Sequence, residues 1–297
     1  MVSIDALMVN IIQSVLTGLM QGGIYALISI GLTIIFGVMG IINFAQADFM
    51  MLGMYGSLVI VAAFAINPLI VFFALIPVFL IIGGVIQKTL INPIIDEQED
   101  AQLILTFGIL LILENGALIV FGSSPQSLDV SYAVTALSFG PFSVSEAKFI
   151  SFVFAIGLAA VVFFLLQYTE YGRAMRATAN NHEVAEYSGI DVGNMYTAAF
   201  ALGITLTASA GALLVMYYPA SPTVGFDFVL LMFVVVVLGG LGSVKGAVVA
   251  GFIIGVVQQV SIVFLPLQVE PGVVFVLFLI VLLVKPEGIY GTAAREV

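Results

Sequence analysis

The longest charged interval of the chain runs from Arg173 to Gly189 and reads RAMRATANNHEVAEYSG. Its second part, residues 183–190, can form a short amphipathic helix with Val184 and Tyr187, and Ile190 if the helix extends so far, on one side and Glu183 and Glu186 on another. Such a helix fits a groove on a soluble partner, although an ordinary connecting loop explains the residues equally well. The residues expected to contact a partner are Arg173, Arg176, Glu183, Glu186, Tyr187 and Gly189, and this glycine also offers a helix stop.

A second polar group lies near the N-terminus. Gln21 and Tyr25 are four residues apart and share a helix face with Gly18 and Gly22. Side chains at this spacing are neighbours on a helix, so the face is both closely packed and polar. It indicates a hydrogen-bonded seam between helices, which is the simpler interpretation, or one wall of a solute pathway.

Two further groups lie within or between apolar segments. Asn43, Gln46 and Asp48 could mark a turn at a membrane surface, or they could line the mouth of a pathway, because polar groups beside a broken helix can hydrogen-bond a passing solute. Glu114 and Asn115 lie inside an apolar segment, where a carboxylate costs about 2.5–3.5 kcal/mol unless it faces a partner or water. We therefore expect Glu114 to face inward, as a structural group or as part of a pathway.

The residue content of the sequence argues against catalytic and metal chemistry. His182 is the single histidine and has no serine and aspartate at a recognisable spacing, which argues against a hydrolase. Cysteine is absent, so disulfides and thiolate metal sites are not available. The sequence also contains no Gly-x4-Gly-Lys-Ser/Thr phosphate loop. We expect no catalytic site, no metal site and no cofactor in this chain.

Composition indicates which elements position these residues. Of 297 residues, 62% are hydrophobic and 8% are charged, and the mean hydropathy is +1.25, whereas about a quarter of a soluble domain is charged. The net charge of −10 has the wrong sign for binding nucleic acid. The chain is therefore predicted to be an all-α polytopic membrane protein, with residues 1–297 forming one domain.

Apolar runs of about 20 residues, the length that crosses a bilayer, predict eight to ten transmembrane or half-membrane helices. The first run is expected to stay in the mature protein, because the N-terminus lacks the positive charge of a signal peptide. The strong spans are 8–29, 46–66, 69–88, 102–121, 149–168, 196–217 and 246–265, and the weaker segments are 30–43, 228–242 and 270–284.

The basic residues predict the orientation, because Lys and Arg stay on the cytoplasmic side. With the 169–195 loop inside, the cytoplasmic residues are Lys88, Arg173, Arg176, Lys245, Lys285 and Arg295, and only Lys148 is outside. The C-terminus is then cytoplasmic, and the 122–148 loop is an external, extended excursion. The side of the N-terminus depends on whether 30–43 crosses the membrane.

The 30 glycines predict close helix packing. Pairs spaced by four residues on one helix face are Gly18 with Gly22, Gly242 with Gly246, and Gly251 with Gly255. Other glycines could break helices and leave backbone groups that line a cavity, and these candidates are Gly37, Gly40, Gly239, Gly240 and Gly242. Residues 36–57 and 236–255 are also weakly similar, which is explained by an internal repeat or by chance.

Several blocks resemble the branched-chain amino acid permeases of ATP-binding-cassette importers, of the LivH type. GRAMRATANNHEVAEYSGID resembles the cytoplasmic coupling segment of that family, and GGIYALISIGLTIIFGVMGIINFAQADF resembles its N-terminal signature. GALLVMYYPASPTVGF and VVLGGLGSVKGAVVAGFIIG follow in the family's order. Two departures are Ala47, where the family usually has glycine, and Asn180 to His182, which replace a more acidic stretch.

The resemblance implies a type II importer fold in the inner or plasma membrane. Two permease chains, identical or of LivH and LivM type, would form a central pathway, and an external solute-binding protein would deliver Leu, Ile or Val. Two cytoplasmic ATPases, which bind ATP and Mg²⁺, would dock on the coupling segment at about 169–195 and drive alternating access. The alternatives are an importer permease for another amino acid, an amide or urea, or a passive or ion-coupled carrier of small solutes.

Overall fold

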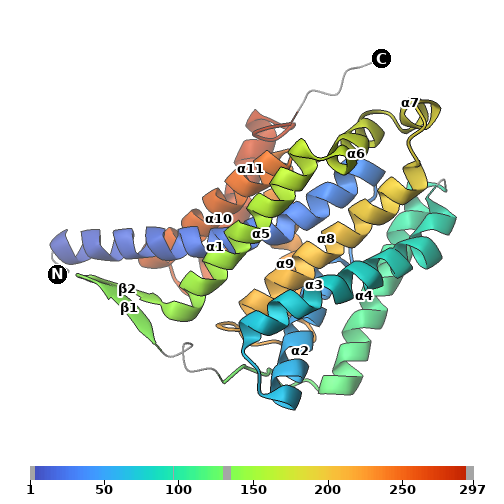
Figure 1. The fold of residues 1–297 in the computed structure, drawn as a ribbon. Coiled ribbons are helices and arrows are strands. Elements are labelled where there is room, and N and C mark those ends of the chain that lie inside the picture. The colour runs from blue at the N-terminus through green and yellow to red at the C-terminus, as the bar shows by residue number, and fades with distance from the viewer. Residues whose placement is uncertain (1–3, 96, 130–134, 292–297) are drawn as a thin grey trace.

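The computed structural model describes residues 4–95, 97–129 and 135–291 (Figure 1). In this part of the chain, seven helices are long and apolar enough to cross a membrane and two apolar helices are shorter, which confirms an all-α polytopic membrane protein. The helices are α1 (Ile4–Met39), α2 (Gln46–Phe64), α3 (Pro68–Ile86), α4 (Glu99–Phe121), α5 (Glu146–Tyr168), α6 (Glu170–Asn180), α7 (His182–Tyr187), α8 (Val192–Leu214), α9 (Val224–Gly239), α10 (Val244–Phe264) and α11 (Glu270–Val284).

Short elements complete the described chain. A π-helical turn (Gln87–Ile91) and a 3-10 turn (Asn92–Ile94) continue α3, and another 3-10 turn (Leu267–Val269) precedes α11. The strands β1 (Ala136–Phe139) and β2 (Phe142–Ser145) form an antiparallel hairpin. This hairpin is the extended excursion that we predicted within 122–148.

Helix α1 corrects one prediction. The segments 8–29 and 30–43 are not separate, because the helix continues without interruption to Met39. Gly31 and Gly37 are tolerated inside it, and the break comes only at Gly40, whose φ is +71°. With 36 residues at 1.5 Å each, α1 is about 54 Å long, well beyond the hydrocarbon core of about 30 Å.

A glycine seam joins α1 to α10 and confirms the packing role predicted for the pairs Gly18 with Gly22 and Gly251 with Gly255. The prediction for the third pair was wrong, because Gly242 has φ of +81° and precedes α10, so it does not share a helix face with Gly246. A Cβ added to Gly18 would lie 2.7 Å from the carbonyl oxygen of Gly255, and one added to Gly22 would lie 2.8 Å from that of Gly251. Since the backbones touch, no larger residue fits without separating the two helices. Farther along α1, Gly37 meets Gly242 in the same way, so Gly37 is a contact within a helix and not a helix break.

Two helices begin inside the bundle instead of at its surface. Gln46 is the first residue of α2, and its side-chain amide donates to the carbonyl of Gly203 at the middle of α8. Residues 40–45 therefore lead from the end of α1 back into the protein. Helix α9 begins beside the first turn of α2, where Gly225 lies against Asp48. Non-helical backbone at this depth is tolerated because it is buried in protein.

The two ends of the bundle differ. One end, called here the α7 end, carries α6, α7 and the turn between α9 and α10, while the other, the hairpin end, carries β1 and β2 and the start of α1 (Figure 1). At the α7 end, Gly240 and Gly242 adopt φ of +103° and +81°, and Gly239 closes α9. These three glycines and Gly40 therefore lie at helix ends. The turn carries the N-cap Ser243, which accepts from the amide of Gly246.

Candidate functional site

The polar residues that start α2 hold the broken helix in place. Asn43 and Gln46 are almost completely buried, which excludes a turn at the membrane surface. The Asn43 amide donates to Gln46 Oε1 at 2.9 Å, and Gln46 Nε2 donates to Thr207 Oγ1 at 2.7 Å as well as to the Gly203 carbonyl. The Asn43 side chain also accepts from the amide of Ala45. These bonds satisfy backbone and side-chain groups that hydrocarbon could not.

Asp48 lies one turn further, where α2 and α9 both begin. Its side chain is buried against Gly225. Glu114 on α4 is half-buried. Asn115 instead lies on the exposed surface of α4, where its amide donates to the Leu111 carbonyl one turn earlier. Two helix N-termini and the Asp48 carboxylate therefore meet in this region of the chain.

Gln21 and Tyr25 form the predicted hydrogen-bonded seam. The Tyr25 hydroxyl donates to Gln258 Oε1 on α10 at 2.5 Å, and the Tyr217 hydroxyl donates to Gln21 Oε1 at 3.2 Å. The Tyr25 ring meets Phe228 of α9 edge to face, with 6.2 Å between the ring centroids. The seam thus connects α1, α9 and α10, and through Gln258 it reaches a cavity near the hairpin end.

This cavity, called here the acidic cavity, has a volume of about 390 Å³ between α9, α10 and α11, which falls in the usual range for small-molecule sites of about 300–1,000 Å³. Asp227 and Glu270 supply carboxylates, and apolar side chains form most of the remaining wall. Glu270 is only 8% exposed, and its Oε1 accepts no hydrogen bond in the described structure. The lining residues that the argument uses are Tyr218, Asp227, Leu230, Gln258, Glu270 and Val274.

The chemistry of the acidic cavity suits a small molecule with one cationic group and one apolar group. An unpaired buried carboxylate oxygen gains a strong hydrogen bond from an ammonium. Burial raises the pKa of Tyr218, and the charge of Asp227 adds to the effect, so the phenol stays neutral and can donate. An aliphatic side chain would contact Leu230 and Val274.

Sequence reasoning missed Asp227, Gln258 and Glu270. A signal existed for the two carboxylates, since they are isolated acidic residues at the starts of the weak spans 228–242 and 270–284. The insertion cost that singled out Glu114 applies to them as well. Gln258 gave no signal, because its partner Tyr25 lies 233 positions away in the sequence.

The predicted partner surface at the α7 end consists of two helices rather than one. Asn181 separates them and caps α7, accepting from the amide of Val184. Tyr187 is 88% exposed and Val184 is 58% exposed, and Glu183 and Glu186 are exposed beside them. Helix α7 ends at Tyr187, so Ile190 lies outside it, contrary to the longer helix that we considered.

Gly189 ends α7 as expected. Its φ is +83°, its amide donates to the Glu186 carbonyl, and the Ile190 amide donates to the Ala185 carbonyl. This pair of bonds is the Schellman motif. Arg173 and Arg176 lie on α6 instead: Arg173 forms an exposed ion pair with Glu170, with 3.4 Å between the charged atoms, and Arg176 donates to the Gln167 carbonyl.

Comparison with known proteins identifies the family of the chain. Residues 14–284 match the family described as "Branched-chain amino acid transport system / permease component". The chain belongs to this permease family. The high-affinity branched-chain amino acid permease LivH of Salmonella typhimurium is 31% identical over 96% of this chain and 97% of its own, and BraD of Pseudomonas aeruginosa is 29% identical over the same shares.

More distant transporters are also similar to the permease. The autoinducer 2 import permease LsrD of Escherichia coli is 26% identical, over 73% of this chain and 66% of its own. No solved structure matches the chain. The family is one of multi-pass membrane permeases that operate in transport systems with other subunits, and it is not a family of enzymes.

Proposed function

We propose that this permease is the membrane subunit of an ATP-binding-cassette importer that moves Leu, Ile or Val inward by alternating access. The observation that carries the proposal is the match to the branched-chain amino acid permease family over residues 14–284. An identical or related second permease would complete the pathway, and an external solute-binding protein would deliver the amino acid. ATP and Mg²⁺ would be bound by two partner ATPases.

The positions of the basic residues support an orientation with the α7 end in the cytoplasm. In the described part of the chain, Lys88, Arg173, Arg176, Lys245 and Lys285 belong to elements at this end, while Lys148 begins α5 at the hairpin end. Basic residues are retained in the cytoplasm. Because α1 ends at the α7 end as one uninterrupted helix, its N-terminus would be external. The C-terminus would be cytoplasmic in the inner or plasma membrane.

The exposed face of α7 supports docking of an ATPase. Tyr187 and Val184 present apolar surface to solvent between two glutamates, an arrangement that suits a groove on a soluble subunit. Closure of the ATPase pair would move α6 and α7, and the permease would switch between two states that the partner biases.

The acidic cavity supports an amino acid as the solute. Glu270 and Asp227 would receive the ammonium group, and Leu230 and Val274 would contact the branched side chain. Asn43, Gln46, Asp48, Glu114 and Asn115 remain candidates for later stages of the pathway. For Asn43, Gln46 and Asn115, the hydrogen bonds within this chain already provide a structural role.

Docking is tested by co-purifying the permease with its ATPase and measuring solute-stimulated ATP hydrolysis. We expect Glu186→Arg and Tyr187→Ala to lose at least tenfold in ATPase retained, because central aromatic contacts dominate interface energies. Glu99→Arg is the matched control, since it makes the same charge change at the exposed start of α4, near the α7 end. Full retention in both α7 variants would contradict docking on this helix.

The solute is tested by uptake into proteoliposomes that contain the whole importer. Leu, Ile and Val should compete with one another, whereas urea and simple amides should not. Glu270→Gln should lower leucine uptake about tenfold or more, because a charged hydrogen bond is lost, while Asp129→Asn in the exposed loop before the hairpin should not. Unchanged leucine uptake in Glu270→Gln would contradict the role of the acidic cavity. Uptake without ATPase would favour a passive carrier.

A further inference from the structure

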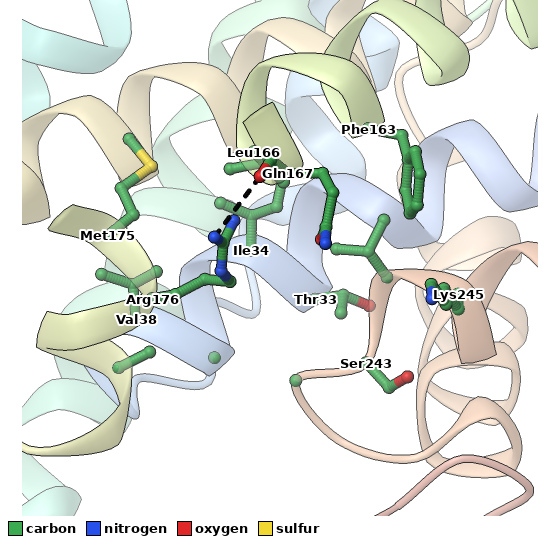
Figure 2. Close-up of a pocket in the computed structure, with 14 residues that line it drawn as sticks. Thr33, Ile34, Val38, Phe163, Leu166, Gln167, Met175, Arg176, Ser243 and Lys245 are labelled. Carbon is green, nitrogen blue, oxygen red and sulfur yellow. Dashed lines mark hydrogen bonds between the residues drawn. The ribbon is translucent and has the colours of Figure 1, made fainter. Parts of the chain in front are cut away.

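A second cavity lies at the α7 end and is built from different chemistry. It has a volume of about 210 Å³ and is enclosed by the last turns of α1 and α5, by α6 and by the turn that starts α10 (Figure 2). We call it the basic cavity. Arg176 and Lys245 are its charged lining residues, and none of the described residues that line it is acidic. An anionic group in this cavity would therefore lie near two cationic side chains, with no carboxylate in the described lining to repel it.

The positions of the two cations are fixed by neighbouring groups. The Lys245 ammonium lies over the Phe163 ring, 5.7 Å from its centroid, where the face of the ring stabilises a cation. The Arg176 guanidinium donates to the Gln167 carbonyl at 3.4 Å, as Figure 2 shows. Lys245 also lies in the first turn of α10, whose N-terminus carries a partial positive charge.

An unpaired hydroxyl points to a ligand in the basic cavity. Thr33 of α1 is only 1% exposed, and its Oγ1 has no hydrogen-bond partner in the described structure. Figure 2 shows this hydroxyl directed toward the Lys245 side of the cavity. A buried hydroxyl without a partner is costly, and an anionic oxygen in the cavity would accept a hydrogen bond from it.

An apolar groove continues from the basic cavity between α5 and α10. It has a volume of about 480 Å³ and shares Phe163, Val244 and Lys245 with the basic cavity. Its other walls follow the two helices toward the middle of the bundle and are almost entirely apolar, formed by Ile156, Ala159, Ala160, Val248 and Val249 together with Tyr290. A ligand that fills both spaces needs an anionic head and a hydrocarbon chain.

We propose that the basic cavity and this groove bind one anionic phospholipid from the leaflet at the α7 end. Its phosphate lies between Arg176, Lys245 and the Thr33 hydroxyl, and one acyl chain lies along α5 and α10. Basic pockets between membrane helices are suited to acidic lipid headgroups. Because Arg176 belongs to α6, which Asn181 joins directly to α7, the lipid would also fix the position of the helix that leads to α7. The lipid site does not depend on which solute the permease carries.

The test is native mass spectrometry of the full chain in detergent, titrated with dioleoyl phosphatidylglycerol or dioleoyl phosphatidylcholine. We expect one phosphatidylglycerol to remain bound to the wild type at concentrations at which phosphatidylcholine does not. The double variant Lys245→Gln with Arg176→Gln should bind phosphatidylglycerol about thirtyfold more weakly, the effect of two basic residues near a membrane surface. Lys88→Gln with Lys285→Gln removes two charges at the same end, outside the basic cavity, and should bind like the wild type.

Two further measurements distinguish binding of a lipid from binding of a free anion. Ala160→Phe fills the apolar groove at an exposed position, so it should weaken phosphatidylglycerol binding while the protein keeps its melting temperature in lipid-free detergent. Inorganic phosphate should neither displace the lipid nor raise the melting temperature. Equal phosphatidylglycerol binding in the wild type and the double variant would overturn the site. Stabilisation by phosphate alone, unaffected by Ala160→Phe, would overturn the lipid and indicate a site for a soluble anion.

Discussion

The helices at the centre of the permease are no more apolar than those at its periphery, but they are packed in different ways. In the apolar 18-residue stretches of α1 and α8, 78% and 83% of the residues are buried within this one chain, whereas 17% are buried in the corresponding stretch of α4. The central helices carry small residues where they touch, and α4 carries large exposed side chains such as Ile112 and Ile119. Hydropathy places a helix in the membrane, and residue size at the contact decides which helices form the core.

The largest effect should come from cutting a large side chain out of the centre. Phe200 of α8 is fully buried and Phe107 of α4 is half exposed. Phe200→Ala should lower the unfolding free energy by about 3–5 kcal/mol, through the cavity it leaves. Phe107→Ala should change it by less than about 0.5 kcal/mol. Unfolding in mixed micelles of increasing denaturing detergent measures both, and equal losses would contradict the distinction between centre and periphery.

Overfilling the glycine seam should cost somewhat less. Gly22→Leu places a side chain where a Cβ alone already lies 2.8 Å from backbone atoms of α10, so the helices must separate at a cost of about 3 kcal/mol. Gly116 on α4 has open space at its Cβ position, and Gly116→Leu is the control. The fraction of monodisperse protein after detergent extraction should fall in the first variant alone. If both extract equally well, the seam does not hold the core together.

Removing the polar support of the broken helix should have an intermediate effect. Gln46→Leu leaves the Gly203 carbonyl and the Thr207 hydroxyl without the amide that now bonds them, at a cost of about 1–3 kcal/mol. In Asn115→Leu only a bond within α4 is lost, at an exposed site, and unfolding should be almost unchanged. A smaller loss for Gln46→Leu than for Asn115→Leu would show that the buried bonds are not needed.

The smallest effect should be local to α7. Gly189→Ala forces a side chain into φ of +83°, which costs about 1–2 kcal/mol. Amide exchange of Ser188 to Ile190 should speed up while the helices of the core keep their protection. Gly108→Ala, at an open position on α4 without positive φ, should leave exchange unchanged in α7. Unaltered exchange at Ser188 to Ile190 would contradict the role of Gly189 as a helix stop.

The sequence was sufficient for the membrane-spanning helices, because each is an apolar run long enough to be recognised by itself. It was also sufficient for Gly18 with Gly22 and Gly251 with Gly255, whose four-residue spacing places each pair on one helix face, but not for Gly242 with Gly246, because Gly242 lies in the turn before α10. It failed for α1, where an apolar run of unusual length was divided in two although Gly31 does not interrupt the helix. The weakly similar segments 36–57 and 236–255 each contain a helix end with positive φ, at Gly40 and Gly240.

The environment of polar residues could not be predicted, because it depends on partners that are remote in the sequence. Gln46 was assigned to a surface or a pathway mouth, yet its partners Gly203 and Thr207 are 157 and 161 positions away. The acidic cavity was missed for a similar reason. Asp227 and Glu270 resemble ordinary residues at the surface end of a span until α9 and α11 are seen beside each other.

The length of α1 has a mechanical consequence. At its start, the Gln13 side chain bonds the backbone of Ser143 in the hairpin, and near its end Gly37 rests on Gly242 beside the basic cavity. An unbroken helix is stiff over this distance, so a displacement imposed at one of these points is transmitted to the other. Helix α1 thus connects the hairpin end to the α7 end without an intervening joint.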